Sequence, residues 1–247
     1  MQGSPATAID YFFAGARLIV KPGFRRFILI PLLINLVIFV LVTIALFHAF
    51  GDFFAQVLER SPNWLDWFAW LLWPIVAFVF LVIYGYSFNI ITNFLAAPFF
   101  GLLAEKIETQ LTGVAPPEEP WGQLIPRTLQ RETVKLWYFV SRGILVLLVF
   151  AVLFFIPGAN LLGVVIGALW SCWCMAVQYS DYPADNHQLS FKELRRRLNS
   201  QKLTSFSYGG IILLGSMVPV LNIFVTPIAV AGATLYWVKE VKQQVPL

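Results

Sequence analysis

Two adjacent arginines, Arg25 and Arg26, follow a Pro-Gly break and directly precede a long apolar run. Their forked N–H groups match the oxygens of a tetrahedral oxyanion such as sulfate or phosphate. Gly23 lets the backbone approach a ligand closely, and the start of a following helix offers free N–H groups. The same arginines would also serve as anchors beside a membrane-spanning helix. The residues alone therefore leave two interpretations open, an oxyanion site or a membrane anchor.

A second candidate group lies at the end of the stretch NFLAAPFFGLLAEKIE, residues 93–108. Glu105, Lys106 and Glu108 follow a long apolar segment, and the two glutamates fall one turn apart on one helix face. One interpretation is a solvated helix end. The other is a polar conduction path, which would include Asn93, because charged and amide groups near membrane depth usually face a cavity.

No catalytic constellation is visible in the sequence, which has no nucleophile elbow, phosphate-binding loop or zinc-ligand spacing. His187 ends the stretch DYPADNH, residues 181–187. This stretch would form either a metal site of Asp and His side chains or a polar cap that holds the loop before the next helix. We favour the cap, and we expect no enzyme, no cofactor, no metal ion and no nucleic acid partner.

The composition is that of a membrane protein. Hydrophobic residues make up 59% of the 247 residues and charged residues only 12%, about half the roughly 25% of a soluble domain. Four long segments carry no charge: residues 27–51, 67–104, 143–180 and 203–238. Nothing between them resembles a linker between soluble domains, so we expect a single integral membrane domain over residues 1–247.

The fold class predicted from these segments is an all-α membrane protein. A spanning helix needs about 20 apolar residues, so residues 27–51 and residues 64–108 predict two long transmembrane helices. Residues 1–22 carry apolar side chains at helical spacing and predict an amphipathic helix that lies on the membrane. Pro98 and Gly101 predict an interruption of the second long helix as it leaves the membrane.

The last two charge-free segments are broken near their middles, one at Pro157-Gly158 and the other at Pro219. Each break leaves two arms that are marginal for spanning a bilayer. We therefore predict two partly inserted helical hairpins, residues 125–180 and 203–240. A polar turn inside hydrocarbon would leave backbone groups without partners, so each turn must lie against protein, a cavity or the far interface.

The positive charges are unevenly distributed among the connecting segments. All but Arg60 of the 17 lysines and arginines fall in segments that this arrangement of spans and hairpins places on one side of the membrane. Cytoplasmic segments carry an excess of lysine and arginine. The distribution therefore predicts that the N-terminus and nearly all of the polar sequence are cytoplasmic.

The order of four motifs resembles the CysZ family of bacterial inner-membrane sulfate permeases, within the etoposide-induced-protein-like superfamily. The motifs are the Gly-Phe-Arg-Arg turn, NFLAAPFFGLLAEKIE, DYPADNH followed by Phe191, and PVLNIFVTPIAVAGAT. The resemblance covers nearly the whole chain. It implies two long transmembrane helices and two partly inserted hairpins, as the charge-free segments also predict.

The resemblance also implies an activity, the import of sulfate for sulfate assimilation and cysteine biosynthesis. The route would be channel-like or proton-coupled, without an ATP-binding subunit. It places sulfate at the backbone around Gly23 and Phe24 and at the side chains of Arg25 and Arg26. Phe24 stands where another apolar residue can stand in the family.

For the conduction path, the resemblance points to the charged end of the second long helix, here Glu105, Lys106 and Glu108. It further implies a homo-oligomer in the lipid bilayer, a dimer or higher, in which protomers of opposite orientation occur. The distribution of lysine and arginine predicts a single orientation instead. The alternative function is that of a non-transporting membrane scaffold, as the eukaryotic etoposide-induced relatives suggest.

Overall fold

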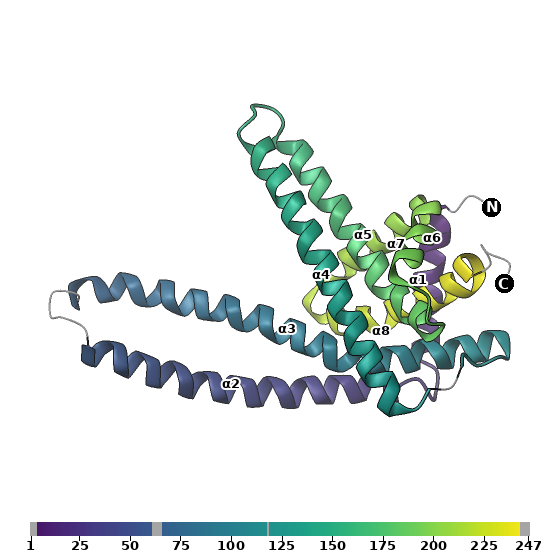
Figure 1. Cartoon of the computed structure of the whole chain (residues 1–247), viewed down its shortest axis with the longest axis horizontal. Coiled ribbons are helices and arrows are strands. Elements are labelled where there is room, and N and C mark those ends of the chain that lie inside the picture. Colours follow the sequence, from purple (N-terminus) through teal and green to yellow (C-terminus); the bar gives the residue numbers. More distant parts are fainter. Residues whose placement is uncertain (1–3, 61–65, 118, 243–247) are drawn as a thin grey trace. The chain divides into compact units, whose positions relative to one another are not determined.

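The computed structural model describes residues 4–60, 66–117 and 119–242, except for some side chains within the helices. All regular elements among these residues are helices (Figure 1). In chain order they are α1 (Pro5–Ile19), α2 (Arg26–Arg60), α3 (Asp66–Thr112), α4 (Trp121–Phe154), α5 (Asn160–Asn186), α6 (Phe191–Ser200), α7 (Lys202–Ser216), α8 (Pro219–Tyr236) and the π-helix η2 (Trp237–Val241). The all-α prediction is confirmed.

The chain divides into two compact units, and the boundaries between them fall within α2 and within α3. The smaller unit comprises residues 30–96, and the larger comprises residues 1–29 together with 97–247. The prediction that residues 1–247 form a single membrane domain stays a prediction.

The smaller unit consists of most of α2 and the first part of α3, which run antiparallel to each other (Figure 1). The hydroxyl groups of Thr43 and Tyr84 lie 2.7 Å apart and join the two helices. Most of the described apolar side chains are exposed, among them Leu33, Leu41 and Leu81. Residues 29–49 are long and apolar enough to cross a membrane, and lipid is the medium that such a surface requires.

The helix bounds differ from the predicted ones in two places. α2 continues past residue 51 to Arg60, because the end of an apolar segment limits the membrane span and not the helix. α3 is continuous from Asp66 to Thr112, so the predicted interruption at Pro98 and Gly101 is wrong. Buried side chains on both sides of these positions, such as Ala97 and Leu103, pack one face of the helix and stabilise it through them. The predicted start at residue 64 lies outside the described residues.

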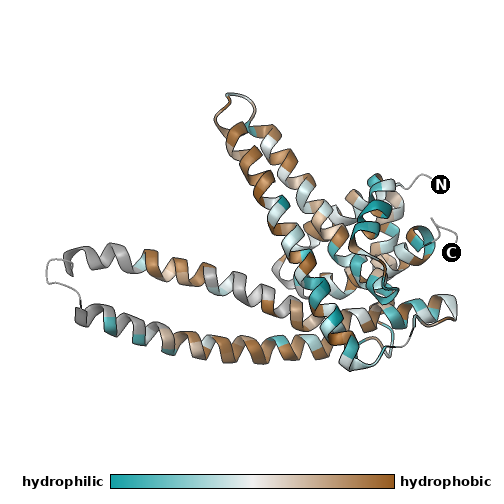
Figure 2. Cartoon of the chain, in the orientation of Figure 1, coloured by the Kyte–Doolittle hydropathy of each residue, from teal (hydrophilic) through white to brown (hydrophobic). Residues whose placement is uncertain are grey.

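The larger unit contains both predicted hairpins. α4 and α5 are joined by a turn at residues 155–159, where Gly158 has a φ of +80°, and α7 and α8 by a turn just before Pro219. α4 begins well before its charge-free part, so α4 and α5 are 34 and 27 residues long. Figure 2 shows mainly hydrophobic residues in the halves of α4 and α5 that adjoin the turn between them. By length and composition both helices are able to cross a membrane, and how deeply they insert stays a prediction.

The core of the larger unit lies where α1, α5, α7 and α8 pack together. Tyr208 and Tyr236 are fully buried in it, and the Tyr208 hydroxyl donates a 2.6 Å hydrogen bond to the carbonyl of Ala229. α1 buries a face that includes Ala8 and Tyr11 against α7 and α8, and it leaves Ile9 and Phe13 exposed. The N-terminal helix is therefore anchored to the protein while its other apolar side chains remain available to lipid.

Candidate functional site

The turn between α1 and α2 is held by two buried aromatic side chains. Phe24 is 1% exposed and Phe27 9%. The Phe24 N–H donates to the carbonyl of Lys21, and the Phe27 N–H donates to the carbonyl of Phe24. Gly23 has a φ of +95°, a conformation that L side chains rarely adopt. The sequence therefore forms a fixed turn in which the glycine backbone is exposed and the rings beside it are buried.

Arg25 and Arg26 are exposed on this turn. The Nε of Arg25 donates a 3.3 Å hydrogen bond to the carbonyl of Val20, and the guanidinium of Arg26 lies 4.9 Å from the centroid of the Phe27 ring. Within the described part of the chain, neither guanidinium forms an ion pair with a carboxylate. Both arginines therefore retain N–H donors for an anion.

Lys106 of α3 reaches the same turn. Its Nζ lies 3.6 Å from the position that a Cβ atom on Gly23 would occupy. It also lies 5.8 Å from the ring centroids of both Phe24 and Phe27, within the distance at which an aromatic ring attracts a cation. The sequence predicted Lys106 as part of a conduction path with its neighbours, and nothing in the sequence indicated that it meets Gly23.

Glu108 lies in a different environment from Lys106. Its carboxylate is 1% exposed and accepts hydrogen bonds from His187 Nε2 at 2.8 Å and from Lys242 Nζ at 2.9 Å. Burial raises the pKa of Glu108, but the hydrogen bonds from His187 and Lys242 outweigh it, so the pKa is lowered from the ordinary 4.5. His187 also stacks on Trp237, with 5.9 Å between the ring centroids. Glu108 thus holds η2 and the end of α5 to α3.

Glu105 lines an open pocket of about 220 Å³ together with Glu119, Trp121 and Arg127. Arg127 forms an ion pair with Glu119 at this pocket, with 2.7 Å between Nη2 and Oε2. The side chain of Asn93 lies outside the described residues. The residues predicted for a conduction path, Glu105, Lys106 and Glu108, are therefore directed to three separate places.

Sequence reasoning did not predict a ladder of ion pairs between α4 and α5. Arg131 pairs with Asp181 at 2.7 Å, and the Nζ of Lys135 lies 3.2 Å from Asp181 and 2.5 Å from Glu132. Lys135 and Asp181 are each 1% exposed. One signal was present, because basic residues recur every four positions at 127, 131 and 135, and acidic residues at 181 and 185. The ladder neutralises charges that would otherwise be buried alone.

The stretch 181–187 serves this packing. Asp181 and Asp185 pair with arginines of α4, and His187 pairs with Glu108. Among the described residues, no group of three or more His, Cys, Asp and Glu side chains is placed to hold a metal ion. The side chains of Asp181, Asp185 and His187 are therefore engaged in ion pairs with α4 and α3.

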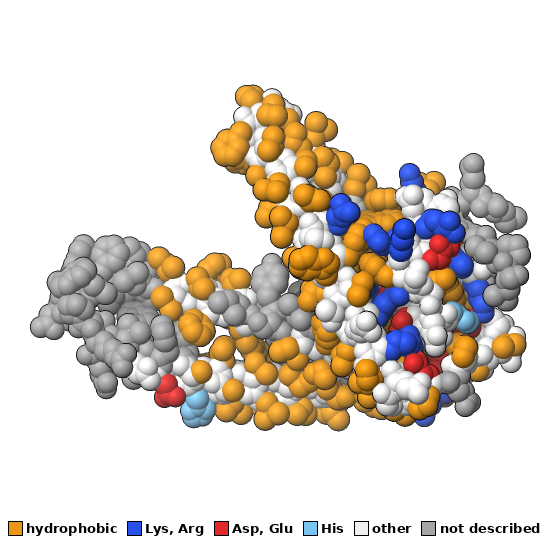
Figure 3. Space-filling view, viewed as in Figure 1, with side chains coloured by type: hydrophobic (Ala, Val, Ile, Leu, Met, Phe, Trp, Pro, Cys, Tyr) orange, Lys and Arg blue, Asp and Glu red, His pale blue; other side chains and the backbone are white. Residues whose placement is uncertain are grey.

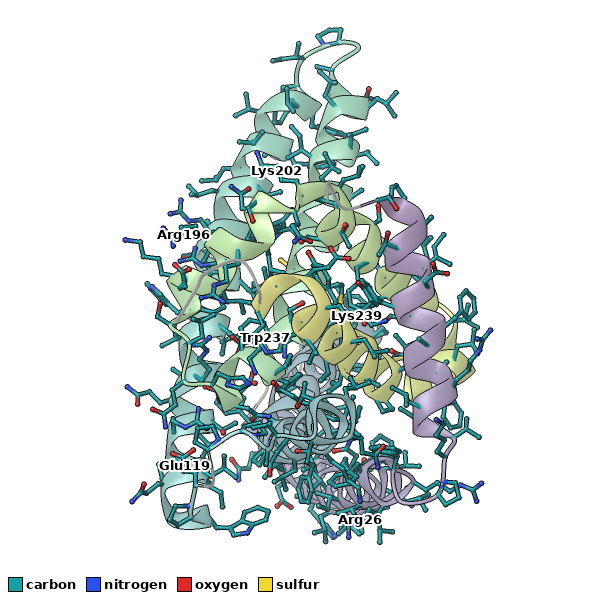
Figure 4. The ribbon with its side chains drawn as sticks, turned by 90° about the vertical axis from the view of Figure 1, so that its right-hand side faces the viewer. Arg26, Glu119, Arg196, Lys202, Trp237 and Lys239 are labelled. Carbon is teal, nitrogen blue, oxygen red and sulfur yellow. The ribbon has the colours of Figure 1, made fainter. Side chains whose placement is uncertain are left out.

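A second basic region lies on α6 and the start of α7, and Figure 3 shows lysines and arginines gathered over this part of the larger unit. Figure 4 shows Arg196 and Lys202 well away from Arg26, which lies at the start of α2. Both are exposed, and Arg196 pairs with Glu193. These cations are therefore not part of the turn around Gly23.

A family model and individual relatives that are similar to this chain carry the same description, sulfate transporter CysZ. A family model described as "Sulfate transporter CysZ/Etoposide-induced protein 2.4" matches residues 11–227. A Salmonella typhi protein described as "Sulfate transporter CysZ" is 41% identical over 240 residues, which cover 95% of this chain and 92% of that protein. A Pectobacterium atrosepticum protein of the same description is 41% identical over 236 residues, which cover 94% of this chain and 84% of that protein.

Proposed function

The chain belongs to the family of the sulfate transporter CysZ and etoposide-induced protein 2.4, and on this premise we propose that it is a sulfate permease. It imports sulfate across the bacterial inner membrane for sulfate assimilation and cysteine biosynthesis. The observation that carries the proposal is the pair of exposed guanidinium groups at the Gly23 turn, neither of which has a carboxylate partner in the described chain. Arg25 and Arg26 are also the arginines at which the family resemblance places sulfate, and this supports the proposal.

The proposed sulfate site consists of Gly23, Phe24, Arg25 and Arg26. Sulfate is a tetrahedral dianion, and two guanidinium groups supply forked donors to its oxygens. Gly23 has a positive φ that other residues rarely adopt, and its exposed backbone carries no side chain that would keep a ligand away. Because the Phe24 N–H already donates to Lys21, we assign Phe24 the role of a buried anchor that fixes the turn.

The path that sulfate follows after binding is proposed to involve Glu105 and the pocket that it shares with Arg127 and Glu119. Glu108 is proposed to support this end of α3, because its carboxylate is buried between His187 and Lys242. We further propose that most polar segments are cytoplasmic, in line with the distribution of lysine and arginine, and that the protein acts as a homo-oligomer.

The test is radiolabelled sulfate flux into liposomes that contain the purified full-length protein. The wild type is expected to show saturable flux. In the variant Arg25→Ala/Arg26→Ala the flux is expected to fall by a factor of about ten or more, because charge-assisted hydrogen bonds to sulfate are lost. The matched control is Arg196→Ala/Lys202→Ala, which removes two exposed cations far from Arg26 (Figure 4) and should keep normal flux.

Other outcomes identify the alternatives. Equal flux in both double variants would return Arg25 and Arg26 to a role as membrane anchors. No flux in the wild type, with folded protein in the liposomes, would reject the permease and support a membrane scaffold.

A further inference from the structure

Lys106 lies at the Gly23 turn, where residues of the turn contact its ammonium group. Its ammonium group lies 5.8 Å from the centroids of the Phe24 and Phe27 rings. It faces the Gly23 backbone, at 3.6 Å from the position of an absent Cβ atom. Phe24 and Phe27 are buried, so they hold the ammonium group in place without neutralising its charge.

In the described residues Lys106 forms no ion pair. The nearby carboxylate of Glu108 is occupied by His187 and Lys242. An ammonium group that is partly removed from water requires hydrogen-bond acceptors for its three N–H donors. The face of an aromatic ring is only a weak acceptor.

Lys106 shares the Phe27 ring with Arg26. The guanidinium of Arg26 lies 4.9 Å from the ring centroid and the Lys106 ammonium 5.8 Å from it. Two cations that approach the same ring repel each other unless an anion lies near both. Arg25 adds a third positive charge on the same turn. The arrangement is therefore complementary to an anion of more than one negative charge.

We propose that Lys106 is a third cationic ligand of the anion that binds at the Gly23 turn, and that its charge favours dianions over monoanions. This inference rests on the proposed function and deepens it. The attraction of an added positive charge is twice as large for a dianion as for a monoanion at the same distance. Lys106 comes from α3, whereas Gly23, Arg25 and Arg26 belong to the start of α2 and the turn before it. Bound sulfate therefore links the two segments.

The test measures the binding of sulfate and of nitrate to the full-length protein in detergent by isothermal titration calorimetry. Lys106→Met keeps the aliphatic stem that packs on the rings and removes the charge. It is expected to raise the Kd for sulfate about tenfold, as for one lost charge-assisted hydrogen bond, and to change the Kd for nitrate much less. Lys106→Arg should restore most of the sulfate affinity.

The matched control is Lys239→Met. The Nζ of Lys239 lies 5.8 Å from the centroid of the Tyr11 ring, so this variant removes a lysine from a comparable aromatic contact outside the site. It should bind sulfate as the wild type does. Thermal unfolding without sulfate separates binding from folding, because Lys106→Met should keep the wild-type midpoint and show a smaller upward shift when sulfate is added.

The outcomes separate this inference from the proposed function. If Lys106→Met binds sulfate like the wild type while Arg25→Ala/Arg26→Ala does not, Lys106 is no ligand and the permease proposal stands. If Lys106→Met weakens sulfate and nitrate equally, or if Lys106→Arg fails to restore affinity, the selection of dianions by charge is rejected. If the folded wild type neither binds nor transports sulfate, both proposals fail together.

Discussion

The carboxylate of Glu108 accepts a hydrogen bond from the ammonium group of Lys242, although 134 residues separate them in the sequence. His187 reaches the same carboxylate from the end of α5. The last described residue of the chain is thereby fixed to α3. Glu108, which is 1% exposed, is the central group of this cluster.

Replacing Glu108 by Gln is expected to lower the free energy of unfolding by about 2 kcal/mol, since hydrogen bonds to a charged group are lost. Thermal unfolding of the protein in detergent, followed by tryptophan fluorescence, measures the change. Glu193→Gln is the control, because Glu193 is more exposed than Glu108 and one of its partners, Arg196, is 74% exposed. An equal loss in both variants would contradict the central role of Glu108.

The same carboxylate makes stability depend on pH. The pKa of Glu108 is lowered in the folded protein from its ordinary 4.5, by the hydrogen bonds from His187 and Lys242 acting against burial. As the pH falls, the Glu108 carboxylate is therefore protonated at a higher pH in the unfolded chain than in the folded protein. Its contribution to the free energy of unfolding is lost as the pH falls through the folded pKa. Between about pH 6 and about pH 3, the wild type should lose more stability than Glu108→Gln. Parallel pH profiles would show that Glu108 does not titrate as described.

Gly23 and Gly113 offer a matched pair. Both have a positive φ, +95° and +74°, but a Cβ atom on Gly23 would meet Lys106 Nζ, whereas one on Gly113 would meet nothing within 4 Å. Replacement by Ala should destabilise the protein by about 1 kcal/mol at either position, because of the backbone strain. Only Gly23→Ala should weaken sulfate binding in calorimetry. Weakening by Gly113→Ala as well would indicate a general loss of structure.

Gly209 and Gly210 test the packing of α7 on α5. A Cβ atom on Gly209 would lie 1.8 Å from the carbonyl oxygen of Cys172, and one on Gly210 would lie 3.5 Å from the Cys172 sulfur. Gly209→Ala must therefore displace backbone, and we expect a loss of about 3 kcal/mol or more. Gly210→Ala should lose less than about 1 kcal/mol. Size-exclusion chromatography and thermal unfolding in detergent would show the difference, and similar behaviour of the two variants would contradict the close helix contact.

Lys135 tests the ladder between α4 and α5. Lys135→Met leaves the carboxylates of Glu132 and Asp181 without their shared cation, and we expect a loss of about 3–5 kcal/mol. Arg196→Ala removes a cation that is 74% exposed and should change stability by less than about 1 kcal/mol. Unfolding midpoints in detergent provide the comparison. A Lys135→Met protein as stable as the wild type would show that the ladder does not hold the hairpin.

The sequence by itself determined the class of protein and the positions of several turns between its helices. Charge-free segments are a direct consequence of contact with lipid, and proline and glycine favour turns through their own backbone geometry. The turns at Pro157-Gly158 and before Pro219 could therefore be predicted, and so could the turn at Gly23. The continuous course of α3 through Pro98 could not, because burial of one face outweighs a local break.

Only the tertiary structure decided which charged side chains meet. Glu105, Lys106 and Glu108 are neighbours in the sequence, yet they reach a pocket, the Gly23 turn and the contact with Lys242. Successive residues on a helix point about 100° apart, so their partners depend on which helices pack on each face. Those contacts join segments far apart in the chain, and no local pattern specifies them. The sequence therefore named Lys106 as a candidate site residue beside Glu105 and Glu108, but not its place at the Gly23 turn.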